Sequence, residues 1–158
     1  MLTLTDIESG LKEWDWQLQH LQEPIPHIRA NYVFPYENYE IIVSLLIRMK
    51  KDFLLVTSVN LIKNIKETER YLAFLQANDT TLGCKFYMPL SHGDDPSKET
   101  GIIDCAFEVP VEHLTREMAM DMIDNLLAEI EYHVPGMIKA KLLDISEVLH
   151  KDKEVKES

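Results

Sequence analysis

The sequence has few of the residues that build phosphate loops and disulfide frameworks. Its 158 residues include five glycines and two cysteines. The glycines are scattered, so the chain has no glycine-rich phosphate loop, dinucleotide-binding fingerprint or Gly-x-Ser-x-Gly elbow. Two cysteines are too few for a disulfide-dense secreted scaffold. Most enzyme classes that short motifs identify are therefore disfavoured, and we expect no catalytic residues and no cofactor.

Basic residues are also scarce, with 16 Lys and Arg against 27 Asp and Glu, which gives a net charge of −11. A charge of this sign repels phosphate backbones and anionic lipid head groups, so we expect neither nucleic acid nor a membrane as a partner. No apolar run approaches the roughly 18 to 20 residues that cross a bilayer. The first residues also lack the basic and apolar regions of a secretory signal, and we expect a cytoplasmic protein.

Metal-ligand spacing is absent as well, because no histidine lies close to another histidine or to a cysteine. His113 and Glu117, and also Glu129 and His133, are separated by four residues and could share helix faces, but neither pair has a third ligand. The run His92-Gly93-Asp94-Asp95 lacks the alternating oxygen ligands of a calcium loop and is typical of a hairpin turn. We therefore expect no bound metal.

A chain with 46% hydrophobic residues is long enough to bury one core. We expect a single domain over residues 1–149 and a charged, disordered tail over residues 150–158. A capping box at residues 5–8, followed by apolar residues at helical spacing, predicts a first helix over residues 6–21. The prolines at positions 24 and 26 then end that helix.

Three strands are predicted next, over residues 28–34, 39–48 and 53–59, with the last two joined as a hairpin in which Arg48 pairs with Phe53. One face of this hairpin is wholly aliphatic, with Ile41, Val43, Leu45, Ile47, Leu54 and Val56. The other face is diluted by Ser44, Arg48 and Thr57 but is still more apolar than a solvated sheet surface. Its apolar members are Ile42, Leu46, Phe53, Leu55 and Val59.

A second helix is predicted after an Asn64 cap, in a capping box with Glu67, and it ends near residue 78. A central hairpin follows, with a polar loop over residues 91–99. Its first strand has an apolar face of Cys84, Phe86, Met88 and Leu90, and its second has Ile103, Cys105, Phe107 and Val109. Cysteines on one apolar face are interpreted as buried thiols rather than as a disulfide.

The longest helix is predicted to begin at a Thr115 cap, and its apolar arc of about 200° is wider than one packed face needs. Pro135 and Gly136 are expected to kink or interrupt this helix before a further apolar helical segment. The opposite stripe of Glu117, Asp121, Asp124 and Glu131 is expected to be solvated, although a surface for a basic segment stays an alternative. The resulting fold class is α+β, with an antiparallel sheet of about five strands in the order α-β-β-β-α-β-β-α.

Several segments that follow this order of helices and strands lie within residues 14–137. They are Leu54-Leu55-Val56-Thr57, the helix over residues 68–76, Asn78, the strands over residues 85–88 and 101–107, and the helix after Leu114-Thr115. Together they resemble a YbjN-like domain, a relative of the type III secretion chaperone fold. The resemblance implies a small, acidic, usually dimeric protein without catalysis. In the secretion chaperones such a protein holds a partly extended partner segment, and a regulatory role in sensory signalling is suggested for the YbjN-like branch.

The leading hypothesis is a non-enzymatic homodimer, chaperone-like or regulator-like, that docks a partner segment on excess apolar surface. The rival is an enzyme or small-ligand-binding protein whose pocket between sheet and helices has His92, Asp94 or His113 at its rim. A third possibility is a scaffold subunit of a larger complex. The predicted partner-binding residues are Met118, Met120, Met122, Leu127, Ile42, Leu46 and Leu55.

Overall fold

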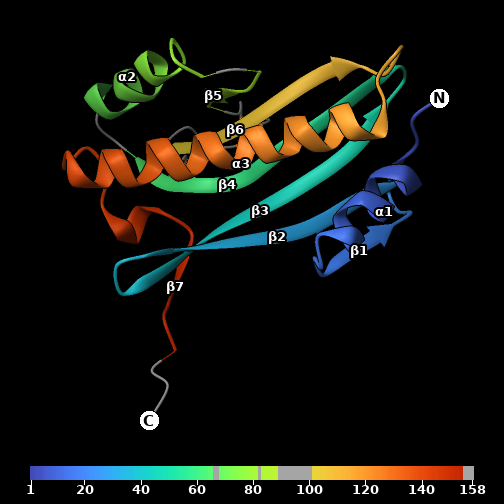
Figure 1. The fold of residues 1–158 in the computed structure, drawn as a ribbon. Coiled ribbons are helices and arrows are strands. Elements are labelled where there is room, and N and C mark those ends of the chain that lie inside the picture. Colours follow the sequence, from blue (N-terminus) through green and yellow to red (C-terminus); the bar gives the residue numbers. More distant parts are fainter. Residues whose placement is uncertain (66–67, 82, 89–100, 155–158) are drawn as a thin grey trace.

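The computed structural model describes residues 1–65, 68–81, 83–88 and 101–154 and has an α+β fold, as predicted (Figure 1). The sheet has seven strands instead of about five. In chain order the elements are α1 (Leu4–Glu13), β1 (Leu18–Leu21), β2 (His27–Tyr36), β3 (Tyr39–Lys50), β4 (Phe53–Ile65), α2 (Thr68–Ala77), β5 (Lys85–Tyr87), β6 (Gly101–Pro110), α3 (Arg116–Lys139), the short 3-10 helix η2 (Ile145–Glu147) and β7 (His150–Asp152).

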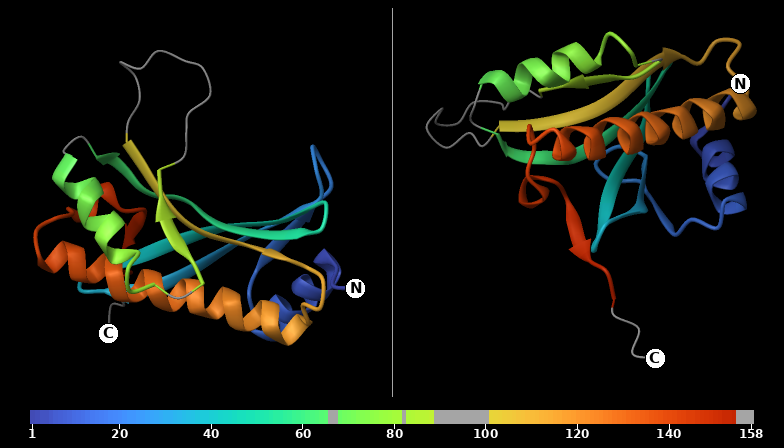
Figure 2. Two further views of the ribbon diagram at one scale, coloured as in Figure 1. Left: turned by 90° about the horizontal axis from the view of Figure 1, so that it is seen from above. Right: turned by 60° about the vertical axis from the view of Figure 1, so that its left-hand side comes forward.

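The sheet is antiparallel, with the strand order β1-β2-β3-β4-β6-β5 and with β7 added beside β3. Helices α1 and α3 lie on the same side of the curved sheet (Figure 2). The face that they cover carries the aliphatic set predicted from alternation, and all of its members are buried: Ile41, Val43, Leu45, Ile47, Leu54 and Val56. The core therefore lies between this face and the two helices.

Helix α3 begins at the predicted cap, because the Met118 backbone N–H donates to Thr115 Oγ1 over 3.1 Å. Of the two predicted effects of Pro135, a kink or an interruption, the interruption is wrong, since the helix continues to Lys139. A proline inside a helix removes one backbone hydrogen bond, but Val134 and Met137 are both buried on the core side and hold the turn in place.

The wide apolar arc of α3 is shared between the sheet and α1. Gly10 of α1 lies against Met120, and a Cβ atom at position 10 would come within 2.6 Å of the Met120 sulfur. Met120 itself is buried. One arc therefore packs against two neighbours, which accounts for a width that a single packed face would not need.

The first helix is shorter than predicted. Its capping box joins Thr3 and Asp6, whose backbone N–H donates to Thr3 Oγ1, rather than residues 5–8. After Glu13 the chain turns through Asp15, which has a φ of +59°, and Leu18 and Leu21 lie in β1 instead of on a helix. A spacing of three residues between two leucines suits a helix, but the left-handed turn ends it first.

Two boundaries around β4 also differ from the prediction. The β3–β4 hairpin pairs Lys50 with Phe53, so the turn has two residues and not four. This shift of two residues leaves every side chain on its predicted face. At the other end, the predicted cap position 64 lies within β4, because the strand continues through the buried Ile65 and α2 begins only at Thr68.

The second predicted hairpin is confirmed in part, because β5 pairs with β6 and places Phe86 opposite Cys105. The first strand is shorter than predicted, and Met88 beyond its end is exposed. Leu90 and the predicted loop over residues 91–99 lie outside the described residues.

A gap within the sheet is filled by the C-terminal segment. Strand β4 leaves β3 after Ser58, at an irregularity that includes Asn60 with a φ of +53°. In the gap, the Ile42 N–H donates to the Leu149 carbonyl over 2.9 Å, and the Leu149 N–H donates to the Leu61 carbonyl over 3.2 Å. Residues 148–152, here termed the inserted segment, end in β7. The prediction of a disordered tail is therefore wrong for residues 150–152, while residues 155–158 lie outside the described part.

Candidate functional site

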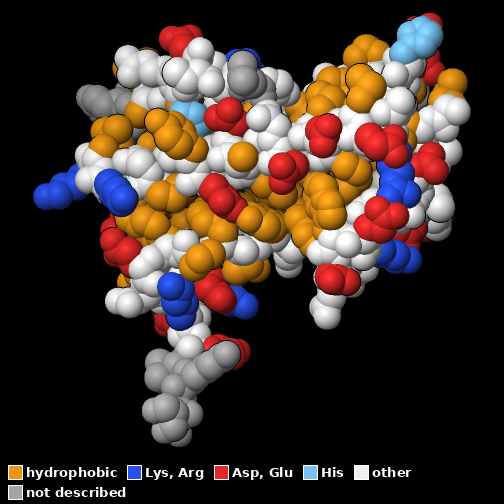
Figure 3. Space-filling view, viewed as in Figure 1, with side chains coloured by type: hydrophobic (Ala, Val, Ile, Leu, Met, Phe, Trp, Pro, Cys, Tyr) orange, Lys and Arg blue, Asp and Glu red, His pale blue; other side chains and the backbone are white. Residues whose placement is uncertain are grey.

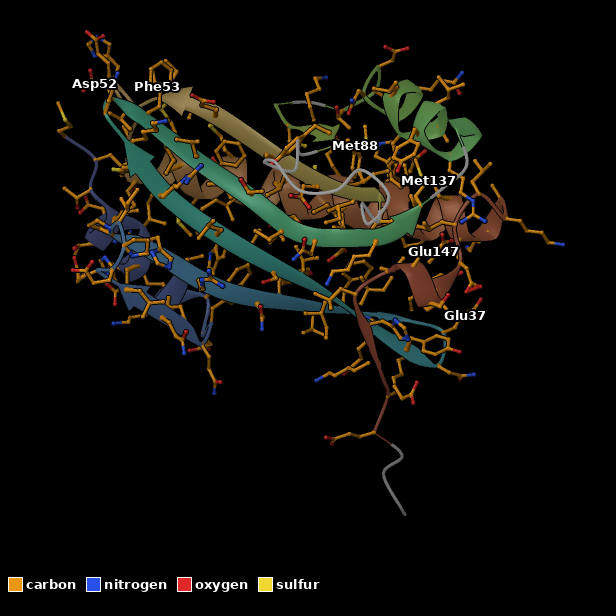
Figure 4. All side chains as sticks on the ribbon, turned by 180° about the vertical axis from the view of Figure 1, so that it is seen from behind. Glu37, Asp52, Phe53, Met88, Met137 and Glu147 are labelled. Carbon is orange, nitrogen blue, oxygen red and sulfur yellow. The ribbon has the colours of Figure 1, made fainter. Side chains whose placement is uncertain are left out.

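One face of the sheet has no helix over it in the described part of the chain, and we term it the open face. Figure 4 shows the molecule from this side, with the strands in front of α3 and with Asp52 and Phe53 at the β3–β4 turn. Because side chains alternate along a strand, the open face receives every second residue of β3. These residues are Glu40, Ile42, Ser44, Leu46, Arg48 and Lys50, and Glu40 pairs with Lys151 of β7.

The strand register gathers apolar side chains on the open face. Val33 of β2 lies opposite Ile42, and Leu55 of β4 lies opposite Arg48, next to Leu46. Ile42, Leu46 and Leu55 are only partly buried, and Val33 is exposed. Cross-strand neighbours have Cβ atoms about 5 Å apart, so Val33 and Ile42 form one apolar pair and Leu46 and Leu55 form another, with Asn31 and Ser44 between the two pairs. Three of the predicted partner-binding residues therefore do share one surface.

The predicted residues on α3 lie on the other side of the sheet. Met118 is 50% exposed and Met122 is partly buried. Met120 and Leu127 are only 8% and 4% exposed, because α1 and the sheet occupy the arc on which they lie. The expectation that all seven residues offer accessible surface is therefore wrong for Met120 and Leu127, and the remaining residues are divided between two sides of the molecule.

Charge is distributed unevenly between the two sides. Acidic side chains follow α3 on the helix-covered side, above a band of hydrophobic side chains (Figure 3), and they include the exposed Glu117, Asp121 and Asp124. The open face instead presents Arg29 and Arg48, both exposed. In a chain with an excess of acidic residues, the part of this face around Arg29, Arg48, Leu46 and Leu55 is locally basic and apolar.

The sequence patterns did not single out Arg29 as a candidate binding residue. Arg29 lies directly opposite Leu46 in the β2–β3 pairing, and its Nε donates to His27 Nε2 over 3.4 Å. The same alternation that placed Leu46 on this face could have placed Arg29 there, because the predicted strand over residues 28–34 already contained it.

A shallow hollow of about 590 Å³ lies at the β1–β3 end of the open face. Its polar lining combines carboxamides, a guanidinium and a hydroxyl group, so it offers several hydrogen-bond donors to a polar ligand group. The residues that supply them are Gln17, Gln19, Arg29, Asn31 and Ser44.

A buried carboxylate lies at the other end of this face. Asp104 is only 5% exposed, and its Oδ1 accepts a 2.8 Å hydrogen bond from the backbone N–H of Asn60, at the irregularity in β4. Burial raises the pKa of Asp104, although backbone donors at Asn60 and Leu61 oppose this shift. Tyr87 lies opposite Asp104 in the β5–β6 pairing. These contacts hold the irregular part of β4 in place.

Replacing Asp104 with asparagine should change how stability depends on pH. Since the folded-state pKa of Asp104 is raised, its protonated form stabilises the fold at low pH, and this contribution is lost as the pH rises through the folded-state pKa. The free energy of unfolding of the wild type minus that of Asp104→Asn should therefore fall as the pH rises above about 4, the usual pKa of an aspartate. Urea unfolding at several pH values measures this difference. A difference that rises with pH would contradict the buried-carboxyl interpretation.

The two thiols are buried in the core, with Cys105 on the core face of β6. Cys84 and Cys105 are both buried and free. Burial and the hydrogen bond to Cys84 raise the pKa of Cys105, so this thiol stays protonated and is a poor nucleophile. Nearby on α3, Glu129 Oε2 lies 3.2 Å from His133 Nε2, which confirms that this predicted pair shares a helix face.

The alternative hypothesis of an enzyme or small-ligand-binding protein placed His92, Asp94 or His113 at the rim of a pocket. The described residues do not form such a rim. The His113 side chain is 90% exposed in the turn before α3, where its Nε2 lies 3.4 Å from Glu112. His92 and Asp94 lie outside the part of the chain that the structure describes. Within the ranges described, no three His, Cys, Asp or Glu side chains are grouped so that they could hold a metal ion. None of the described helices is long and apolar enough to cross a membrane.

Comparison with known proteins identifies the fold. No protein-family profile and no curated protein matches the chain in sequence. Among solved structures, YbjN from E. coli, a proposed transcription regulator, has a TM-score of 0.60 and 9% sequence identity, over 89% of this chain and 94% of that chain. An uncharacterized protein from Methanothermobacter thermautotrophicus has a TM-score of 0.54 and 15% identity, over 90% and 100% of the two chains. At sequence identities of 9% and 15% the similarity concerns the fold alone. The chain has a YbjN-like fold.

Proposed function

We propose that this protein is a non-enzymatic, regulator-like binding module that works as a homodimer and docks a segment of a partner protein on the open face. The supporting observation is the open face itself, with Ile42, Leu46 and Leu55 partly exposed and no described helix over them. Partly exposed apolar side chains on an uncovered sheet face are typical of interaction sites. Completing the burial of each of these side chains would contribute about 1 kcal/mol to binding.

The proposed homodimer interface lies on α2. Leu72 and Leu75 are 51% and 59% exposed and lie three residues apart, on one side of the helix. On the core side, Phe74 packs against Phe86 with ring centroids 5.3 Å apart, which fixes the direction of both leucines. A second copy related by a two-fold axis would cover the same pair on each chain.

The wild-type protein is accordingly expected to sediment at micromolar concentration as a species of twice 18.4 kDa. The double variant Leu72→Glu/Leu75→Glu should shift to the monomer, because charges would face each other across the two-fold axis. Leu46→Ser/Leu55→Ser is the control and should remain a dimer. A wild type that sediments only at 18.4 kDa would refute the homodimer.

Partner docking is tested by capture from native lysate on the immobilised full chain, followed by mass spectrometry. Leu46→Ser/Leu55→Ser should lose proteins that the wild type retains, because it removes apolar surface from the open face. The matched control is Met118→Ser, a half-exposed side chain on the opposite side of the sheet, which should retain them. If all three baits retain the same proteins, docking on the open face is wrong.

A further inference from the structure

We propose that the segment docked on the open face is acidic and amphipathic, with Asp or Glu side chains that pair with Arg29 and Arg48 and apolar side chains that lie on Leu46 and Leu55. This inference rests on the function proposed above and names the chemical class of its partner.

The geometry places the two guanidinium groups beside the apolar side chains. Arg29 lies across the strand pair from Leu46, and Arg48 lies across from Leu55. Leu46 and Arg48 are alternate residues of β3, so their Cα atoms are about 6.7 Å apart. An extended peptide repeats its side chains at the same interval. A segment that alternates acidic and apolar residues would therefore match the surface in charge and in spacing.

The other arginines of the chain already have carboxylate partners. Arg70 forms an ion pair with Glu147, and Arg116 forms one with Glu13, both away from the open face. By contrast, Arg29 donates to His27, and in the described part of the chain neither Arg29 nor Arg48 has a carboxylate partner. Arginine binds carboxylates through two parallel hydrogen bonds, and interface hot spots are enriched in it.

Neighbouring polar groups support the same assignment. Arg29 lines the hollow together with Gln19, Asn31 and Ser44, whose amide and hydroxyl groups can donate to a bound carboxylate. Lys50 adds a further exposed cation at the end of β3. The exposed Glu108 lies opposite Leu55 on β6. Because Arg29, Arg48 and Lys50 outnumber this one carboxylate, the net charge of this part of the face is positive.

A polypeptide fits this surface better than a nucleic acid does. The chain as a whole carries a charge of −11, which repels a long polyanion wherever it extends beyond the basic patch. For a short segment bound to Arg29 and Arg48, screening by salt leaves only the repulsion from acidic groups within about 8–10 Å. Leu46 and Leu55 would also contact apolar side chains, which a sugar–phosphate backbone does not have.

The test is selection of random peptides displayed against the immobilised full chain, followed by fluorescence anisotropy of a selected peptide. Recovered peptides should combine Asp or Glu with apolar residues. Their affinity should fall roughly tenfold in Arg29→Gln or Arg48→Gln and should weaken as salt rises from about 50 to about 500 mM. Arg116→Gln is the matched control, because it removes an arginine of the helix-covered side, and it should bind as the wild type does. Thermal unfolding of each variant confirms that it is folded.

Other outcomes separate this inference from the function on which it rests. Apolar, uncharged peptides that depend on Leu46 and Leu55 but not on the arginines would overturn the acidic partner and leave the docking function in place. Duplex DNA that binds more tightly than any selected peptide, with the same dependence on Arg29 and Arg48, would overturn the acidic segment in favour of a nucleic acid. Peptides indifferent to every open-face substitution would overturn both proposals.

Discussion

Replacing Gly101 with alanine is expected to lower the free energy of unfolding by about 2–4 kcal/mol. Gly101 pairs with Ile65 where β6 begins, and a Cβ atom there would overlap the Tyr71 hydroxyl and the Ile65 carbonyl oxygen. The Tyr71 hydroxyl donates to that same carbonyl over 2.8 Å. The added methyl group therefore displaces backbone and also breaks the hydrogen bond that ties α2 to β4. Urea unfolding measures the loss.

The chain contains a matched control for this substitution. Gly136 lies inside α3, and a Cβ atom there would meet nothing within 4 Å. Gly136→Ala should raise the free energy of unfolding by about 0.5–1 kcal/mol, because alanine loses less backbone entropy in a helix. If Gly101→Ala unfolds at the same urea concentration as the wild type, the close approach of Tyr71 and Ile65 to this position is wrong.

The second large effect is expected for Val148→Asp, at about 3 kcal/mol or more. Val148 is 3% exposed and lies opposite Ile62 at the start of the inserted segment. A carboxylate placed there has to leave the core or remain unpaired, and either outcome pulls the segment from the gap between β3 and β4. Hydrogen exchange at the Ile42 amide, which donates to the Leu149 carbonyl, reports this opening directly.

Asp152→Ala provides the comparison for Val148→Asp. Asp152 lies at the end of β7 with its side chain exposed, so its loss should leave both the stability and the protection of the Ile42 amide nearly unchanged. Equal protection of Ile42 in Val148→Asp and in the wild type would show that the segment does not depend on the burial of this side chain.

The sequence predicts which side chains lie on each face of the sheet, because this depends only on whether a residue has an odd or an even position along its strand. Alternation placed Ile41 on the core face and Ile42 on the open face, and an error of two residues in the β3–β4 register did not alter this. The open face could therefore be anticipated as a surface in need of a cover. Its basic character follows from Arg29 and Arg48 lying on neighbouring strands, which pairing determines and a single strand does not show.

Elements that depend on tertiary contacts could not be predicted from local patterns. Strand β7 has the sequence His-Lys-Asp, which has no apolar alternation, and it exists because β3 has free backbone groups where β4 has moved away. Similarly, the apolar arc of α3 indicated unused surface, whereas Met120 is covered by α1 through a close approach that Gly10 permits. Both errors arise from contacts between residues far apart in the sequence.

The gap between β3 and β4 also bears on how the chain folds. His150 pairs with Ile41, about a hundred residues earlier, so this contact closes a very long loop and carries a high entropic cost. Strands β3 and β4 can meet early through their short turn, but the part of the sheet beyond Ser58 stays unfinished until residues 148–152 arrive. Contacts of such long range slow folding, and until they form, the uncovered backbone of Ile42 and Leu61 is open to strands of other molecules.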